Sequence, residues 1–375
     1  MVAFTKKLLY KSILMATMPR HQTPDFQAKK MAVKRGLGLW EKYLSVWVAL
    51  CILTGIFLGR TFPEISDALA KVEVAHVSIP IAACLFAMIY PIMVQISFEE
   101  IKRASRSPRP IGLTLFMNWA VKPFTMTFFA WLFLAGVFSD FLSPEQVEQY
   151  RAGMILLGVA PCTAMVLVWS YLARGNMGHT LVMTAINSLT MVFLYAPLAT
   201  FLLGVSGIRV PWETIAFSVM VYICTPLVAG YYTRREVLER KGEEWFNRRL
   251  VPALGRMAIA ALLITLVILF AYQGHLITEI PGIIGMITAG IFANILLVFG
   301  ITYVVARIIH LGYEDAAPAA IIAGSNHFEV AIAVAISLFG VESGAALATV
   351  VGVLTEVPLM LFLVLLCRKT RGFFG

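Results

Sequence analysis

Apolar runs of about 20 residues recur along this chain, and they constrain its fold more than any other feature. The 375 residues are 59% hydrophobic and 14% charged, with a mean hydropathy of +0.83. A soluble protein of this size could not bury so much apolar surface, and such runs are typical of transmembrane helices. The strands of a membrane β-barrel would alternate in short segments instead. We therefore expect an all-α polytopic membrane protein.

The hydrophobic pattern predicts ten transmembrane segments with no long soluble domain between them. The predicted segments are 43–62, 76–98, 110–137, 152–172, 179–204, 212–232, 251–273, 282–306, 316–340 and 344–367. Ten segments divide into two halves of five, and an odd-numbered half must be inverted relative to the other. We expect a five-plus-five inverted repeat in which the fourth segment corresponds to the ninth.

Basic residues gather on one side of the predicted membrane. With the N-terminus placed inside, and with Lys42 and Arg256 at their helix edges counted as inside, 25 of the 30 Lys and Arg fall on the cytoplasmic side, and Lys122 lies within a segment. The four on the outer side are Arg60, Lys71, Arg151 and Arg209. This bias predicts cytoplasmic N- and C-termini in a plasma (inner) membrane, so the net charge of +9 implies the lipid bilayer and no nucleic acid as partner. We expect residues 1–36 to be a disordered basic cytoplasmic extension, with a true start at Met31 as the alternative.

The fourth and ninth segments are both interrupted near mid-membrane. The fourth contains Gly158-Val-Ala-Pro-Cys-Thr163, and the ninth contains Ala323-Gly-Ser-Asn-His-Phe-Glu329. Pro161 removes a backbone donor and clashes with the preceding turn, and Gly324 weakens the second helix. Paired interruptions at matching places in two halves indicate a substrate site between crossing broken helices.

Cys162 stands directly after the first predicted break. A soft, polarisable sulfur at this position could bind a thiophilic solute, and the alternative is a small buried residue beside a tolerated membrane proline. The other cysteines, at positions 51, 84, 224 and 367, are scattered and form no CxxC pair. We therefore expect neither a disulfide framework nor a metal site.

Ionisable side chains within the predicted segments are further candidates, because charge inside a bilayer is costly and usually functional. Glu329 suits proton coupling, or it could bond to an open helix end. Glu356 could coordinate a cation or hold an open helix backbone, and His327 could relay protons or pack as a polar residue. Lys122, beside Pro123, could snorkel, pair with a core carboxylate or replace a coupling cation.

Three other polar or aromatic side chains could contact a solute at the breaks, namely Asn187, Asn326 and Trp169. Interhelical hydrogen bonding or ordinary packing is the alternative for each. The chain contains no GxxxxGK[ST], HExxH or GxSxG motif. We therefore expect a secondary transporter without a cofactor, and neither an ATP-driven pump nor an intramembrane enzyme.

Three motifs resemble those of the arsenical-resistance-3 family of arsenite efflux carriers. Ala160-Pro-Cys-Thr-Ala-Met-Val-Leu-Val-Trp-Ser170 is similar to its fourth-segment motif, and Asn326–Ser337 and Gly352–Met360 look like its ninth- and tenth-segment motifs. The resemblance covers residues 40 to 370, approximately, and it implies membership of the bile acid, arsenite and riboflavin transporter superfamily. Its implied fold for residues 37–375 has a panel of segments 1, 2, 6 and 7 and a core of segments 3–5 and 8–10.

The resemblance also implies roles for individual residues. In the family, the cysteine matching Cys162 and the glutamate matching Glu329 are taken as essential, whereas Pro161 stands where many members carry Arg. One thiol can supply one exchangeable As–S contact, and Asn187, Asn326 or Glu329 could hold the arsenite hydroxyls, with Trp169 lining the path. Glu329, Glu356, His327 and Lys122 are the candidates for proton coupling.

The resemblance implies secondary active efflux of arsenite from the cytoplasm, with antimonite as a second candidate cargo. Inward proton movement would drive this efflux by alternating access. The alternative is a sodium-coupled symporter of an organic anion on the same fold, because Glu329, Asn326 and Glu356 would also suit a sodium site. Accumulation against a gradient would distinguish either carrier from a passive channel.

Overall fold

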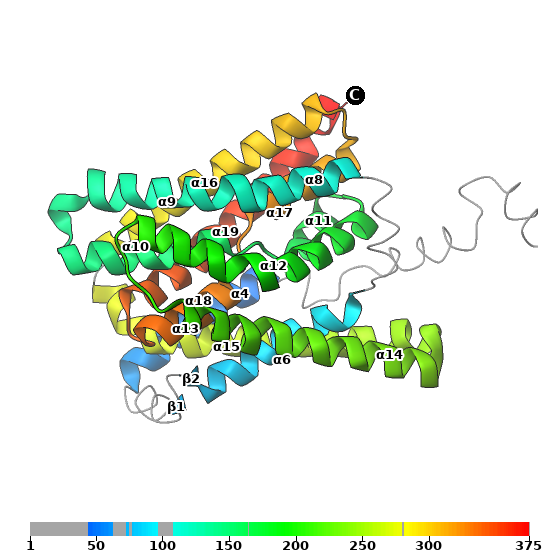
Figure 1. The fold of residues 1–375 in the computed structure, drawn as a ribbon, viewed down its shortest axis with the longest axis horizontal. Coiled ribbons are helices and arrows are strands. Elements are labelled where there is room, and N and C mark those ends of the chain that lie inside the picture. Colours follow the sequence, from blue (N-terminus) through cyan, green and yellow to red (C-terminus); the bar gives the residue numbers. More distant parts are fainter. Residues whose placement is uncertain are drawn as a thin grey trace, which may run out of the picture. The chain divides into compact units, whose positions relative to one another are not determined.

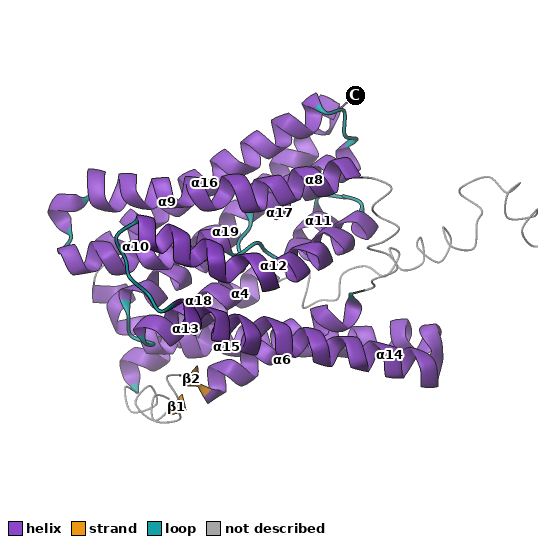
Figure 2. Ribbon diagram, in the orientation of Figure 1, coloured by secondary structure: helices purple, strands orange, loops and turns teal. Residues whose placement is uncertain are grey.

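The structure, a computed structural model, is helical almost throughout the part of the chain that it describes (Figure 2). The described residues are 44–62, 73–74, 77–96, 108–163, 165–279 and 281–374. Within them, the strands β1 (Glu73–Val74) and β2 (Val77–Ser78) form one short antiparallel hairpin. The predicted class, an all-α membrane protein, is confirmed, whereas the predicted extension of residues 1–36 lies outside the described residues.

The helices of the described chain are labelled in Figure 1. Up to residue 205 they are α4 (Leu44–Thr61), α6 (Ile79–Gln95), α8 (Pro108–Phe116), α9 (Lys122–Ala130), α10 (Pro144–Val159), α11 (Val166–Leu172) and α12 (Met177–Val205). They continue as α13 (Trp212–Val219), α14 (Thr225–Trp245), α15 (Val251–Glu279), α16 (Pro281–Ile308), α17 (Tyr313–Gly324), α18 (Phe328–Phe339) and α19 (Gly344–Lys369). The π-helical turns are η1 (Met117–Val121), η2 (Trp131–Val137), η4 (Met220–Cys224) and η5 (Phe246–Leu250), and the 3₁₀ turns are η3 (Ser139–Phe141) and η6 (Arg371–Phe374).

Several helical stretches are long and apolar enough to cross a membrane. In the described chain there are five, namely Pro108–Val137, Met177–Val205, Trp212–Tyr272, Pro281–Ile308 and Gly344–Lys369. Shorter apolar helices lie at Val46–Thr61, Ile81–Gln95 and Phe328–Phe339. The stretch from Trp212 to Tyr272 covers two predicted segments, and its backbone kinks at Gly242 (φ 77°, ψ 169°), between them. The structure therefore supports a membrane protein with several passes, and the division into ten segments stays a prediction.

Proline accounts for three of the four π-helical turns in the described chain. Pro123, Pro226 and Pro252 each stand two residues after such a turn ends. Proline lacks a backbone N–H and its ring crowds the preceding turn, so the regular i to i−4 hydrogen-bond pattern is displaced there. The turn before Pro123 contains Asn118 and is followed directly by Lys122, and both of these polar side chains are fully buried.

Small residues allow close helix contacts at two places. Gly153 of α10 faces α19 so closely that a Cβ atom there would overlap the carbonyl oxygen of Ala345. Gly55 of α4 meets the backbone of α15 at Val267 in the same way. Helices in lipid associate largely through such van der Waals packing, because lipid is as apolar as leucine. The first contact sets α10, which precedes the fourth-segment break, directly against α19.

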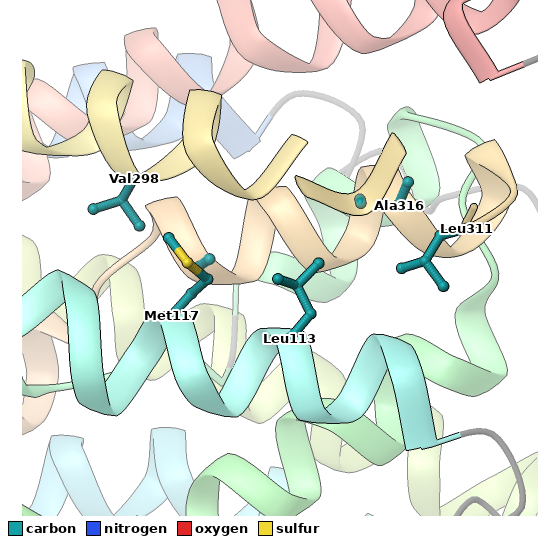
Figure 3. Packing of buried hydrophobic residues seen from close by; sticks show 7 residues of the cluster. Leu113, Met117, Val298, Leu311 and Ala316 are labelled. Carbon is teal, nitrogen blue, oxygen red and sulfur yellow. The ribbon is translucent and has the colours of Figure 1, made fainter. Parts of the chain in front are cut away.

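A buried hydrophobic cluster joins α8 and η1 to α16 and α17 (Figure 3). Its members are Leu113, Met117, Val298, Ala306, Leu311, Ala316 and Ala323. In Figure 3, Leu113 and Met117 point from one helix towards Ala316 and Val298. The cluster therefore fixes the helix that leads to Lys122 beside α17, which ends at Gly324.

Candidate functional site

The first break separates α10 from α11. Helix α10 ends at Val159, Ala160 is extended (φ −91°, ψ 102°), and α11 begins only at Val166. Proline disfavours helical geometry in the residue before it, which accounts for the extended Ala160. The chain therefore runs through Pro161 and Cys162 outside any helix, at the place predicted from the sequence.

The second break separates α17 from α18. Helix α17 ends at Gly324, Ser325 is extended (φ −95°, ψ 152°), and α18 begins at Phe328. Pro318 lies inside α17 without ending it, so the break comes later, at the run of small and polar residues. Asn326 and His327 therefore present backbone groups that no helix satisfies.

The two breaks meet and bond to one another. Pro161 and Asn326 form an isolated antiparallel bridge, and the His327 backbone N–H donates to the Ala160 carbonyl at 2.9 Å. Unpaired backbone groups cost several kcal/mol each in lipid, on the order of 2–7, so broken helices need such partners. The crossing, defined here as residues 160–163 and 325–327, is thus a structural unit built from segments far apart in sequence.

Lys122 reaches the crossing from α9. Its ammonium Nζ donates to the Ser325 carbonyl at 2.8 Å, and the side chain is 0% exposed. Ser325 caps the C-terminal end of α17, where the helix carries partial negative charge. The ammonium also interacts electrostatically with Cys162 and Glu356. Lys122 therefore does not snorkel to a membrane surface and instead binds an open helix end.

Glu356 of α19 binds the second break from the other side. Its carboxylate accepts hydrogen bonds from the Ser325 hydroxyl, from the Asn326 backbone N–H at 3.1 Å and from the Asn326 side-chain amide at 3.4 Å. Hydrogen bonds to a charged group are stronger than those between neutral groups. Of the two alternatives raised by the sequence, Glu356 fits the one in which it holds an open helix backbone.

Glu329 and His327 lie together at the start of α18. Glu329 Oε2 is 2.9 Å from His327 Nδ1, and their side chains are 3% and 1% exposed. The pair is close but lacks the alignment of a hydrogen bond. Glu329 is in the first turn of α18, where the helix dipole favours a negative charge. The geometry thus brings an acid and an imidazole together beside the crossing.

Cys162 is buried within the crossing, with an exposed fraction of 2%. All five cysteines lie in the described part of the chain, and none is in a disulfide. Its neighbour Thr163 is also buried, and the Thr163 hydroxyl has no hydrogen-bond partner among the described residues. The thiol is therefore enclosed by protein in this conformation and adjoins an unsatisfied polar group.

Other buried polar atoms near the predicted site also lack partners in the described structure. The Asn118 amide donates to Asn187 Oδ1 at 3.3 Å, which leaves Asn118 Oδ1 and Asn187 Nδ2 unsatisfied. Asn326 Oδ1 at the crossing and Trp169 Nε1 on α11 are unsatisfied as well. Such atoms are rare in native proteins and call for an explanation such as a ligand or water.

The predicted residues fall into two groups in the structure. Cys162, Asn326, His327, Glu356 and Lys122 meet at or bond to the crossing, with Glu329 in contact through His327. Asn187 is paired to Asn118 on the turn before Lys122, and no described hydrogen bond links the Trp169 indole to the crossing.

Two residues of the crossing were not predicted from the sequence. Ser325 bonds to both Lys122 and Glu356, and Thr163 carries an unsatisfied buried hydroxyl. The signal that could have found Ser325 is a small polar residue immediately after the glycine that ends α17. No group of three His, Cys, Asp or Glu in the described chain converges as metal ligands.

Comparison with known proteins places these features in a family. Residues 82–280 match the Sodium Bile acid symporter family, SBF. An uncharacterized transporter of Synechocystis sp. strain PCC 6803 is 52% identical, with 92% of each chain covered. The arsenical-resistance protein Acr3 of Alkaliphilus metalliredigens is 41% identical over 91% of this chain and 95% of its own. The Acr3 protein of Corynebacterium glutamicum is 34% identical, with 86% and 87% covered.

The three relatives align over most of the chain, and a transporter agrees with the broken-helix geometry. They confirm the expectation that the chain is a transporter rather than an enzyme. The chain belongs to the sodium bile acid symporter family and, within it, is an Acr3-type transporter.

Proposed function

We propose that this transporter exports arsenite from the cytoplasm by alternating access, driven by inward proton movement. The observation that carries the proposal is the Cys162 thiol, buried where the two broken helices cross. Two relatives that align over most of the chain are named arsenical-resistance proteins, which supports arsenite as the cargo. Antimonite has the same thiophilic character and is proposed as a second cargo.

One thiol suits a cargo that must be released. Arsenite at neutral pH is mostly the uncharged trihydroxide, so its arsenic can exchange one hydroxyl for the Cys162 sulfur. The thiol proton and the departing hydroxyl leave as water, and the reverse reaction frees the cargo. A carrier site must bind weakly enough to let its substrate go, which a cage of three thiolates would not do.

The remaining hydroxyls of the cargo need polar partners. Asn326 Oδ1 and Asn187 Nδ2 are buried atoms without a described partner, and they supply one acceptor and one donor. Trp169 Nε1 adds another buried donor, on the helix that follows the break. We propose that these atoms contact the cargo in the loaded state.

Glu329 is our candidate for the residue that exchanges the proton. It lies in the first turn of α18 and contacts His327, which would relay the proton. We propose that protonation of Glu329 from outside weakens the site for arsenite and that deprotonation to the cytoplasm resets it. Lys122 and Glu356 contribute to coupling through the charges that they hold at the crossing.

The same proposal includes the full architecture. It consists of ten transmembrane segments in two inverted halves of five, with a panel of segments 1, 2, 6 and 7 and a core of segments 3–5 and 8–10. Segment four is α10 with α11, and segment nine is α17 with α18. Both termini would be cytoplasmic, which the distribution of Lys and Arg supports.

The test is arsenite uptake into everted membrane vesicles with and without an imposed proton gradient. Wild type should accumulate arsenite only with the gradient. Cys162→Ala and Glu329→Gln should each lose accumulation, whereas Cys84→Ser, a thiol on α6 away from the crossing, should retain it. Antimonite in place of arsenite tests the second cargo in the same vesicles.

Equal accumulation by Cys162→Ala and wild type would refute the thiol mechanism. Equal responses to the proton gradient in Glu329→Gln and wild type would refute the coupling role. The alternative, sodium-coupled symport of an organic anion, is supported by the name of the matching family and by the oxygen-rich surroundings of Glu356. Sodium-dependent anion uptake without arsenite accumulation would favour that alternative.

A further inference from the structure

We propose that the Lys122 ammonium is a built-in cation that occupies the place of a coupling metal ion at the end of α17. The ammonium is fully buried and lies 2.8 Å from the Ser325 carbonyl. Ser325 is the C-terminal capping residue of that helix and lies 203 positions after Lys122 in the sequence. The inference rests on the fold of the crossing and is independent of arsenite as the cargo.

The position of the ammonium is one that cations favour. The last carbonyl groups of a helix have no partner within it, and they carry the negative end of the helix dipole. In broken-helix transporters, C-terminal helix ends and unwound carbonyls are the groups that coordinate Na⁺. Lys122 Nζ donates to such a carbonyl, so a side chain already fills the coordinating position.

The charge balance of the crossing supports this assignment. Glu356 lies on the opposite side of Ser325, accepts from its hydroxyl and interacts electrostatically with Lys122. Ser325 therefore bridges a buried cation and a buried anion without a direct ion pair between them in the described contacts. Breaking a buried pair by removing one partner is strongly destabilising, because the other charge remains unpaired.

A tethered cation has a consequence for coupling. The Lys122 charge is covalently attached to α9 and cannot be released to either side of the membrane. It can therefore influence coupling only through its charge at the crossing, and it is not the ion whose movement across the membrane drives transport. A coupling ion must then bind elsewhere, which is compatible with a proton at Glu329. We therefore expect this transporter to need no sodium, although the family that it matches is named for sodium symport.

The experiment measures the thermal stability of the purified full-length chain in detergent, without arsenite. Ionic strength is held constant while choline chloride is replaced by sodium chloride or methylammonium chloride. Wild type should show the same melting temperature in all three salts. Lys122→Ala should melt lower in choline, and sodium or methylammonium should raise its melting temperature saturably, by about 2 °C or more.

Two further variants distinguish the specific loss of the Lys122 charge from a nonspecific loss of stability. Thr125→Val lies on the same helix and loses the 2.6 Å hydrogen bond to Asn294 Oδ1 without changing charge. It should melt lower but respond to neither cation. Lys122→Ala combined with Glu356→Gln removes both charges, so it should melt above Lys122→Ala in choline and show no cation response.

Three results would overturn the inference. They are a saturable sodium response in wild type, no response to either cation in Lys122→Ala, and a double variant no more stable than the single one. If Lys122→Ala cannot be purified folded in choline, recovery in sodium or methylammonium supports the inference, and failure in all three salts overturns it. Because no arsenite is present, these outcomes are distinct from a failure of the proposed transport.

Discussion

Ser325 shows how much a single small residue can contribute at the crossing. Its carbonyl accepts from Lys122 and its hydroxyl donates to Glu356, so two buried charges depend on one residue. An apolar side chain at this position would leave the buried Glu356 carboxylate without this donor. Buried polar groups that lose a partner bear the full cost of their desolvation.

Ser325→Ala should therefore lower the free energy of unfolding by about 1.5–3 kcal/mol, the range for a hydrogen bond to a charged group. Chemical or thermal denaturation in detergent measures this loss. Ser188→Ala is the matched control, because its buried hydroxyl donates to the Thr184 carbonyl one turn back on α12 and contacts no charged group in the described hydrogen bonds. Equal losses in the two variants would contradict the bridging role of Ser325.

At the scale of elements, the crossing depends on how closely its helices approach. Helix α10 leads into the first break and packs along α19, which carries Glu356. Gly153 permits this approach, since any side chain there would overlap the Ala345 backbone and the Ala348 side chain. A displacement of α19 would move Glu356 relative to Asn326, so packing and the polar network are linked.

Gly153→Ala should therefore destabilise the protein by about 1–3 kcal/mol through overpacking. Gly300→Ala on α16 is the matched control, because a Cβ atom at that glycine meets no atom within 4 Å. That control should be neutral or gain about 0.4–1 kcal/mol, as alanine favours helix more than glycine does. Melting curves of both variants measure their stabilities relative to wild type. Equal stability of Gly153→Ala and Gly300→Ala would refute the proposed close contact.

At the scale of the whole molecule, the proposed orientation rests on the distribution of Lys and Arg, and the proposed number of passes rests on the apolar segments. Five helical stretches of the described chain are long and apolar enough to cross a membrane, and the proposed ten-segment topology adds shorter and broken helices to them. In the proposed orientation the turn at η3 faces outwards and the connection between α14 and α15 faces the cytoplasm. These two connections are both exposed, so they can be probed directly.

A cysteine at Asp140 should react with a membrane-impermeant maleimide in intact cells, and a cysteine at Glu243 should react only in everted vesicles. Both positions are exposed, whereas the five native cysteines are buried or half-buried, so unmodified protein is the background control. Gel-shift labelling measures the result. Labelling of Glu243→Cys in intact cells would contradict the proposed orientation, because it would place this connection outside.

The sequence by itself determined the class of the protein and the first break. The length of the apolar runs is a local property that requires helices crossing a lipid bilayer. Pro161 acts on its own neighbours by removing a donor and restricting Ala160, so an interruption there could be predicted without any tertiary contact. Family motifs around Cys162, Glu329 and Glu356 likewise predicted the kind of transporter that the comparisons show.

Only the tertiary structure decided which groups satisfy the broken helices. The Ala160 carbonyl binds the His327 backbone, and Lys122 binds the Ser325 carbonyl, between segments that lie roughly half the length of the chain apart. No local pattern specifies such partners, because each open backbone group can be satisfied by any donor or acceptor that packing brings within reach. The contacts of Lys122 and Glu356 stayed open in the sequence for this reason, and packing places both side chains against one serine.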